Sequence, residues 1–173
     1  MEICKVSDKK ENPQNNLDKE YIYLGLEHIE SNSAKITINR EFGRQILSTK
    51  NIFVEGDILY GKLRPYLNKV AEPNFAGICS TDILVLKTNI PKILKWLLLS
   101  DDLVSQTSVL MKGVSLPRIG ITDFLNQKIP LPPLSEQQKI VSQIEKIEAK
   151  INVLETDIAE IPKLKEAVLK KYR

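Results

Sequence analysis

Residues 135–161 read SEQQKIVSQIEKIEAKINVLETDIAEI, and this stretch decides the C-terminal part of the fold. Aliphatic residues recur in it at alternating spacings of four and three, which is the heptad pattern of a coiled coil. The a positions hold Ile144, Ile151 and Ile158, and the d positions hold Ile140, Ile147, Leu154 and Ile161. These residues are called the seam below. A row of aliphatic side chains on one helix face is unstable in water, so the seam is expected to pair with a second helix.

Both ends of the predicted helix carry sequence signals. Ser135 followed by Gln138 is the pattern of a capping box, and prolines precede it. At the other end, Pro162 predicts a kink or a break, because proline inside a helix costs about 3 kcal/mol. A second short helix is then expected over residues 163–172.

The partner of the seam is expected to be a second molecule. No heptad segment of comparable length occurs in residues 1–134. The seam therefore predicts a dimerisation surface. The alternative is that the helix folds back onto the N-terminal domain of its own chain.

Residues 1–134 predict a β-rich domain, so the fold class is α+β: this domain followed by a long C-terminal coiled-coil helix in residues 135–173. Short runs of β-branched and aromatic residues, separated by Gly, Pro and Asn, are typical of an antiparallel or mixed sheet. Residues 7–19 predict a loop, and apolar residues at helical spacing predict one helix over residues 91–111. The expected strands are residues 21–26, 35–39, 57–60, 68–71, 77–79, 83–86 and 126–131.

The composition excludes several classes of protein. The chain has 173 residues, of which 42% are hydrophobic, and this suffices for a folded core. No stretch reaches the roughly 18 uncharged apolar residues of a membrane span, and the acidic, polar N-terminus is unlike a signal peptide. Cys4 and Cys79 lie far apart and indicate reduced thiols. We therefore expect a cytoplasmic protein.

Patterns that would support catalysis are weak. The seven glycines form neither a GxGxxG nor a GxxxxGK motif. Glu148 and Lys150 match part of a nuclease pattern, but they flank the seam, where charged residues are common. The only histidine, His28, and two cysteines do not easily supply a structural zinc site. The sequence thus predicts no catalytic residues and no bound metal.

Positive charge is concentrated in one segment. Residues 35–71 hold seven Lys and Arg against three Asp and Glu, whereas the whole chain carries only +3. A local basic patch of this kind can bind a phosphate backbone. Within residues 30–51, Asn, Gln, Ser, Arg and Lys side chains can also form hydrogen bonds with base edges. The alternative is an ordinary solvated hairpin.

Three segments resemble the DNA specificity subunit of type I restriction-modification systems. They are GDILYGKLRPYL at 56–67, GICSTDILVL at 77–86 and LPPLSEQQKI at 131–140. Their order is that of one target recognition domain (1–134) followed by one helical spacer (135–173), and the resemblance covers nearly the whole chain. A typical member has two of each, so the sequence corresponds to a half-length subunit or to part of a longer one.

The resemblance implies a non-catalytic subunit that reads one half of a bipartite DNA target through the major groove. It also implies that long helices pair antiparallel as a spacer, so that a homodimer is expected. Methyltransferase subunits, which bind S-adenosylmethionine, are expected to dock on it, and a restriction subunit to join afterwards. No cofactor is expected on this chain itself. The alternative function is a coiled-coil protein-interaction adaptor that does not bind DNA.

Eight residues are the expected DNA contacts. Those expected to face the duplex are Arg40, Arg44, Gln45, Lys50, Lys112 and Arg118. Lys62 and Arg64 are expected phosphate contacts, and their alternative is a structural role in a strand and turn of the core. Residues 113–117 are expected to form a loop flexible enough to approach the DNA backbone.

The symmetry of a homodimer predicts the form of its target. Two identical domains should read an inverted repeat. The expected spacer at 136–161 has 26 residues, which span about 39 Å at 1.5 Å per residue. This length corresponds to about 11 base pairs, or about one turn of the duplex.

Overall fold

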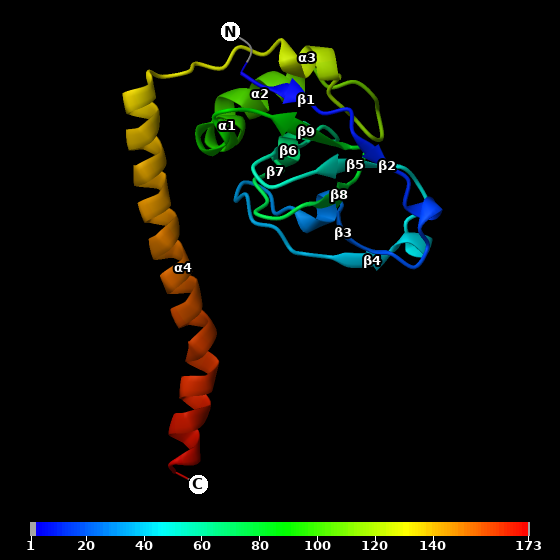
Figure 1. Cartoon of the computed structure of the whole chain (residues 1–173). Helices are drawn as coiled ribbons and strands as arrows, with labels where there is room; N and C mark the ends of the chain where they lie inside the picture. The colour runs from blue at the N-terminus through cyan, green and yellow to red at the C-terminus, as the bar shows by residue number, and fades with distance from the viewer. Residues whose placement is uncertain (1–2, 173) are drawn as a thin grey trace. The chain divides into compact units, whose positions relative to one another are not determined.

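The computed structural model describes residues 3–172 in two units, which divide between Pro130 and Leu131 (Figure 1). The first unit combines two sheets with short helices, and the second contains one long helix. The fold class is therefore α+β, as the sequence predicts.

A four-stranded antiparallel sheet with the order β1-β9-β6-β7 forms the middle layer of the first unit. Along β6, Ile58 and Tyr60 enter one cluster of buried side chains, whereas Leu59 enters another. Both faces of this sheet are thus buried, which explains the nearly continuous apolar runs in its central strands. The strands are β1 (Lys5–Val6), β6 (Ile58–Gly61), β7 (Val70–Ala71) and β9 (Ile83–Lys87).

A five-stranded sheet with the order β2-β5-β8-β3-β4 packs on one face of this layer. It is a mixed sheet, because β3 and β8 run parallel while its other neighbours run antiparallel. This confirms the predicted sheet type. The strands are β2 (Lys10–Glu11), β3 (Glu20–Leu24), β4 (Arg40–Phe42), β5 (Lys50–Phe53) and β8 (Gly77–Cys79).

The strand predicted at residues 35–39 is wrong. Only Ile36 forms a bridge there, with Ile29, and the ladder of β4 begins at Arg40. Asn32 and Ala34 have positive φ angles of 61° and 59°, so the chain is still turning just before this segment. The sequence also missed β1, β2, β4 and β5, because each is short and lacks a clear alternation of apolar residues. The strand β2 lies within residues 7–19, where only a loop was expected.

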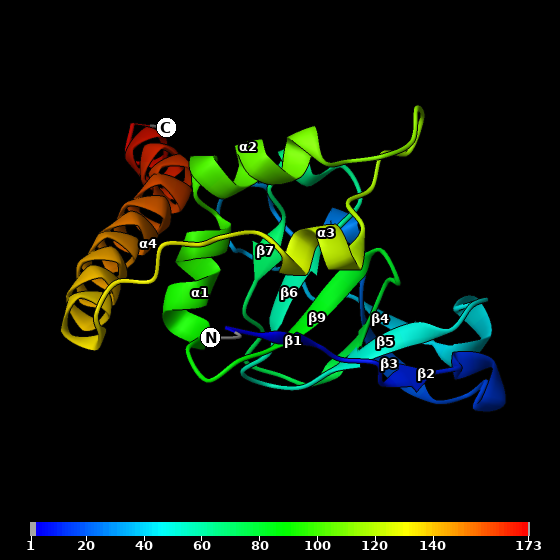
Figure 2. The ribbon, with the colours of Figure 1, turned by 90° about the horizontal axis from the view of Figure 1, so that it is seen from above.

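Three short helices cover the other face of the four-stranded sheet (Figure 2). They are α1 (Pro91–Leu98), α2 (Asp101–Val109) and α3 (Ile121–Leu125). The single helix predicted over residues 91–111 is wrong, because Ser100 has an extended backbone and caps α2 with its side chain. Residues 126–131 form no strand, and α3 precedes them instead.

Burial makes the thiol of Cys79 inert. This side chain lies in the apolar cluster between the two sheets, and burial raises the pKa of Cys79 from 9.0 to about 12. Because only the thiolate reacts readily, we expect a maleimide at pH 8 to leave Cys79 unmodified until the chain is unfolded in urea. The pKa of Cys79 is higher in the folded chain than in the unfolded chain. The contribution of the buried neutral thiol to the free energy of unfolding is therefore complete below about pH 9 and is lost as the pH rises toward 12. Rapid labelling of folded Cys79, followed by mass spectrometry, would contradict the prediction.

The second unit contains α4 (Leu134–Lys170), a helix of 37 residues. It begins before Ser135, so the predicted serine cap is wrong. The Pro133 carbonyl instead accepts hydrogen bonds from two N–H groups of the first turn, at 2.9 and 3.0 Å. The side chain of Gln137 donates to the Pro132 carbonyl at 2.8 Å. Proline can hold the cap position because the cap needs an extended backbone and a carbonyl, but no N–H.

The break predicted at Pro162 is also wrong, since α4 continues through this residue. Residues 163–170 (KLKEAVLK) are mostly good helix formers, and Glu166 pairs with Lys170 at 2.8 Å one turn later. These residues favour helix on the C-terminal side of Pro162, beyond the hydrogen bond that the proline cannot donate. The spacer is therefore longer than expected, about 56 Å at 1.5 Å per residue.

Candidate nucleic-acid interface

Four of the eight predicted contact residues lie around one loop. Residues 112–118 connect α2 to α3 as a narrow hairpin, in which Lys112 and Arg118 exchange backbone hydrogen bonds of 2.8 and 2.9 Å. Arg118 also forms a bridge with Leu63, which brings the neighbours of Leu63 to the same loop. The four residues Lys62, Arg64, Lys112 and Arg118 are called the loop cluster.

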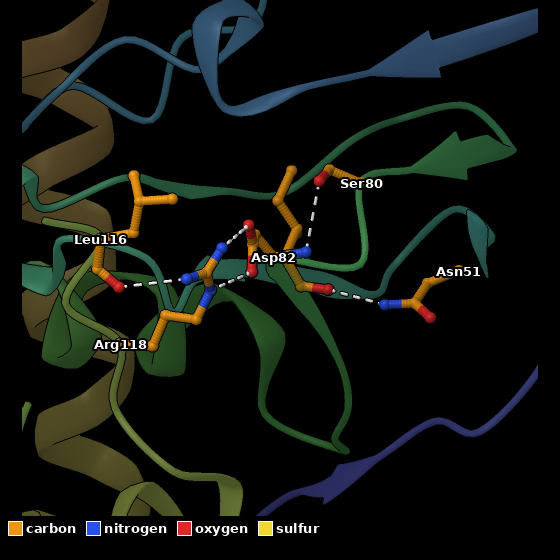
Figure 3. A network of polar contacts seen from close by, with 6 residues as sticks. Asn51, Ser80, Asp82, Leu116 and Arg118 are labelled. Atoms are coloured by element: carbon orange, nitrogen blue, oxygen red, sulfur yellow. Dashed lines mark hydrogen bonds and ion pairs between the residues drawn. The ribbon is translucent and has the colours of Figure 1, made fainter. Parts of the chain in front are cut away.

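Arg118 binds Asp82 through a two-pronged ion pair (Figure 3). Its Nε lies 2.7 Å from Oδ1 and its Nη2 lies 2.9 Å from Oδ2 of this carboxylate, while Nη1 donates to the Leu116 carbonyl at 3.0 Å. Hydrogen bonding from Arg118 holds the pKa of Asp82 below its usual range, and the same bond raises the pKa of Arg118. The pair is therefore charged on both sides at neutral pH. Arg118 is already satisfied within the chain on three of its donor groups.

Asp82 lies in the turn between β8 and β9, and this turn is tied to two other strands. Ser80 accepts the N–H of Asp82 on its hydroxyl oxygen at 3.2 Å, and the N–H of Lys62 donates to the Asp82 carbonyl at 2.9 Å. Asn51 donates from its side chain to the carbonyl of Ile83 at 2.9 Å (Figure 3). The loop is thus anchored, through Arg118, to the framework formed by β5, β6 and β9.

Arg64 also contacts the loop. Its backbone is left-handed (φ 50°, ψ 62°), which is uncommon for a residue with a large side chain. Its N–H donates to the Pro117 carbonyl at 2.7 Å, and its Nη2 lies 3.5 Å from the Ser115 carbonyl oxygen. A left-handed residue persists only where its surroundings hold it, and these contacts with the loop do so here.

Two of the remaining predicted contacts are exposed arginines in the five-stranded sheet and beside it. Arg40 in β4 pairs with Glu20 at 3.0 Å, and Arg44 in the 3₁₀ helix Gly43–Gln45 pairs with Asp18 at 2.9 Å. Exposed ion pairs of this kind contribute about 0–1 kcal/mol. Either guanidinium group can therefore exchange its carboxylate for a phosphate at little cost in stability.

The last two predicted contacts make short-range contacts within the domain. The Gln45 Oε1 atom accepts the N–H of Phe42 at 2.7 Å and so closes its 3₁₀ helix. The Lys50 ammonium donates to the Ser48 hydroxyl at 2.7 Å and lies 5.3 Å from the centre of the Tyr23 ring. The structure therefore brings together four of the eight residues, and the other four lie on β4, β5 and the 3₁₀ helix.

Residues 3–172 contain no group of three or more His, Cys, Asp or Glu side chains arranged to hold a metal ion. The Nδ1 atom of His28 accepts the N–H of Gly25 at 2.9 Å, which gives this side chain a structural role. In the same part of the chain, no helix is both long and apolar enough to cross a membrane.

The seam runs along α4, where its members from Ile147 to Ile161 are 43–64% exposed. Among residues 3–172 the next longest helix, α2, has nine residues. The described chain thus offers no helix of matching length to cover the seam.

Comparison with known proteins identifies the family. A model of the type I restriction modification DNA specificity domain matches residues 1–163, which include the first unit and most of α4. This chain belongs to that family. The type I restriction enzyme EcoDI specificity subunit of Escherichia coli is 31% identical to it over 157 residues.

Solved structures agree with this membership of the specificity-domain family. The HsdS subunit from Thermoanaerobacter tengcongensis matches with a TM-score of 0.74 at 29% identity and covers 88% of this chain. A chain from a structure concerned with complex assembly and conformational transition of the type I R-M system gives the same score and identity over 92% of this chain. This chain spans only 35% of the EcoDI subunit, 42% of the HsdS chain and 43% of the other chain.

Asp82 is the site residue that sequence reasoning missed in this specificity-domain protein. The predicted contacts with DNA are seven cations and the amide Gln45, and they include no carboxylate. Its signal was present in the segment at 77–86 (GICSTDILVL), where an acidic residue directly precedes a buried strand. A charged residue at such a position needs a partner, and Arg118 supplies it.

Proposed function

We propose that this chain is a non-catalytic DNA-recognition module of a type I restriction-modification system, and that it binds one half of a bipartite target. The observation that carries the proposal is the match of the DNA specificity family over residues 1–163. The loop cluster supports it, because this cluster holds cations at fixed positions on one part of the first unit.

The DNA-binding surface of the proposal comprises two sets of residues. In the loop cluster, Lys62, Arg64 and Lys112 supply positive charge for phosphate groups. In and beside the five-stranded sheet, Arg40 and Arg44 supply cations whose present carboxylate partners are exposed. The neighbouring residues Gln45 and Lys50 complete the second set, and their side chains can form hydrogen bonds with base edges.

Assembly through α4 completes the proposal. Two copies pair their seams antiparallel, so that the two domains lie at opposite ends of the spacer and read an inverted repeat. The helix length of about 56 Å corresponds to about 16 base pairs, so the half sites should lie farther apart than the shorter expected spacer implied. Methyltransferase subunits carrying S-adenosylmethionine, and then a restriction subunit, bind to this dimer.

The dependence of binding on salt tests the DNA-binding part of the proposal. The full chain should bind duplex DNA with an affinity that falls steeply between low and physiological salt, because phosphate contacts release counterions. Arg40→Ala and Arg44→Ala should each lower the slope of log K against log salt by about one. Fluorescence anisotropy with a labelled duplex measures both effects.

Lys163→Ala is the matched control, since it removes one exposed cation from α4 at a position outside the seam. It should leave the slope unchanged. No binding at low salt, or an affinity that does not respond to salt, would contradict DNA recognition and favour a protein-interaction adaptor.

A further inference from the structure

The loop at residues 113–117 displays an aliphatic side chain to solvent. Val114 is fully exposed at its tip, with a relative exposure of 102%, and Leu116 is 50% exposed. Gly113 has a φ of 106°, and a Cβ atom at this position would lie 3.3 Å from the Leu116 carbonyl oxygen. A glycine is therefore required for this tight turn. The turn at Gly113 thus leaves the side chain of Val114 exposed to solvent.

Two arginines hold the base of the loop. Arg118 joins it to the Asp82 carboxylate and also binds the Leu116 carbonyl. Arg64 donates its N–H to the carbonyl of Pro117, a residue that is itself buried. The loop thus has its shape before any partner arrives, which lowers the entropy lost on binding.

The charge around the loop favours a polyanion as the partner. The loop cluster brings four cations, and the carboxylates facing them are Asp82 and Asp123, the latter 3.1 Å from the Lys112 ammonium. The residues at the base of the loop therefore carry an excess of two positive charges. DNA offers both a phosphate backbone for the cations and, in the major groove, an apolar group for the valine, namely the 5-methyl group of thymine.

The size of the Val114 side chain favours contact in the major groove over a wedge in the minor groove. Proteins that wedge a side chain between base steps from the minor groove use Phe, Leu, Ile, Met or Pro. The fully exposed Val114 is smaller than most of these and suits contact with a methyl group rather than intercalation, whereas Leu116, which is of the wedge type, is only half exposed.

We propose that residues 113–116 enter the major groove, where Val114 contacts the 5-methyl group of a thymine, and that Asp82 and Arg118 are positioning residues that hold this loop. This inference rests on the proposed function, because it needs a chain that binds DNA. It gives Arg118 a different role from the expected direct contact with the duplex.

Asp82→Asn tests the positioning role, because the two effects of this substitution change the affinity for DNA in opposite directions. The substitution removes a negative charge beside a polyanion, so charge alone would tighten binding. If Asp82 holds the loop, binding to the preferred sequence should weaken about fourfold, while binding to random duplex stays equal or tightens. Arg118→Lys keeps the charge but loses the fork and should weaken preferred binding similarly. Tighter binding of the preferred sequence by Asp82→Asn would overturn the positioning role.

Selection from a pool of randomised duplexes tests the valine contact. The wild-type chain should enrich a motif with a thymine whose replacement by uracil, which lacks only the methyl group, weakens binding about fourfold, as expected for about 0.8 kcal/mol per buried carbon. In Val114→Ala the same replacement should have a smaller effect. Val54→Ala, an exposed valine in the turn before β6, is the matched control and should retain the full uracil effect.

The outcomes separate this inference from the proposed function. Enrichment of no sequence by the wild-type chain would overturn both. Enrichment of a motif that Val114→Ala reads with an unchanged uracil effect would overturn the valine contact alone. If Val114→Ala instead left the motif intact and weakened binding of the methyltransferase subunit, the loop would be a protein contact and the inference would be wrong. Because Val114 is fully exposed, its substitution should not disturb folding.

Discussion

The double substitution Ile151→Asp and Leu154→Asp should convert the chain from a dimer into a monomer. Both residues lie in the middle of the seam, and both are substantially exposed in the single chain. In the proposed dimer each aspartate would enter a desolvated interface, at a penalty of several kcal/mol per buried charge. A loss of about 4 kcal/mol raises the dissociation constant about a thousandfold. Sedimentation at tens of micromolar should then show a monomer.

Asn152→Asp combined with Thr156→Asp is the matched control. It adds the same two charges to the same part of α4, but outside the a and d positions. The control should remain dimeric, and the helical signal in circular dichroism should be similar in both. A wild-type chain that sediments as a monomer at this concentration would contradict the proposed assembly, and a seam variant that remains dimeric would exclude this interface.

Deletion of residues 146–152 should shorten the unread gap of the DNA target by about three base pairs. The deletion removes one complete heptad, so the remaining seam stays in phase. Each helix loses about 10 Å, and in an antiparallel pair the two domains approach each other by the same length. At about 3.4 Å per base pair this is a shift of about three positions, with the half-site sequences unchanged.

Methylation mapping in cells that also contain the methyltransferase partner measures this shift. A deletion of four residues, 146–149, is an informative control, because it breaks the heptad phase and should reduce dimerisation instead of giving a new spacing. An unchanged gap after the seven-residue deletion would show that α4 does not set the distance between half sites.

The sequence was most informative where one physical requirement dominates. The seam predicted a long helix correctly, because only a helix places seven aliphatic residues at heptad spacing on one face. The central strands β6 and β9 were also predicted, since both of their faces are buried and their apolar runs are unbroken. The segment at 35–39 shows the limit: its alternation resembles a strand, but the chain pairs there only at Ile36.

Predictions of helix ends from single residues were wrong where neighbouring residues could cap or continue the helix instead. The Ser135 pattern suggested a cap, but the Pro133 carbonyl could begin the helix earlier. Pro162 suggested a break, but strong helix formers follow it. In the first unit, the reverse happened at Ser100, where a continuous apolar pattern hid the cap that separates α1 from α2.

The candidate site was predictable only in part, because a contact between distant segments has no local signature. The cations of the loop cluster could be selected by residue type, but nothing in the sequence paired Arg118 with Asp82, 36 positions away. The sequence suggested a flexible loop flanked by two cations, whereas this ion pair holds the loop in one position. The shape of a recognition surface depends on such long-range contacts.

The most direct test of the account is to map the methylated target of the wild-type chain, expressed with its methyltransferase partner and without any other specificity subunit. We expect a bipartite target whose two halves are inverted copies of one sequence, separated by a gap that is not read. A continuous target, or two halves of unrelated sequence, would contradict a recognition module that acts as a symmetric pair joined through α4.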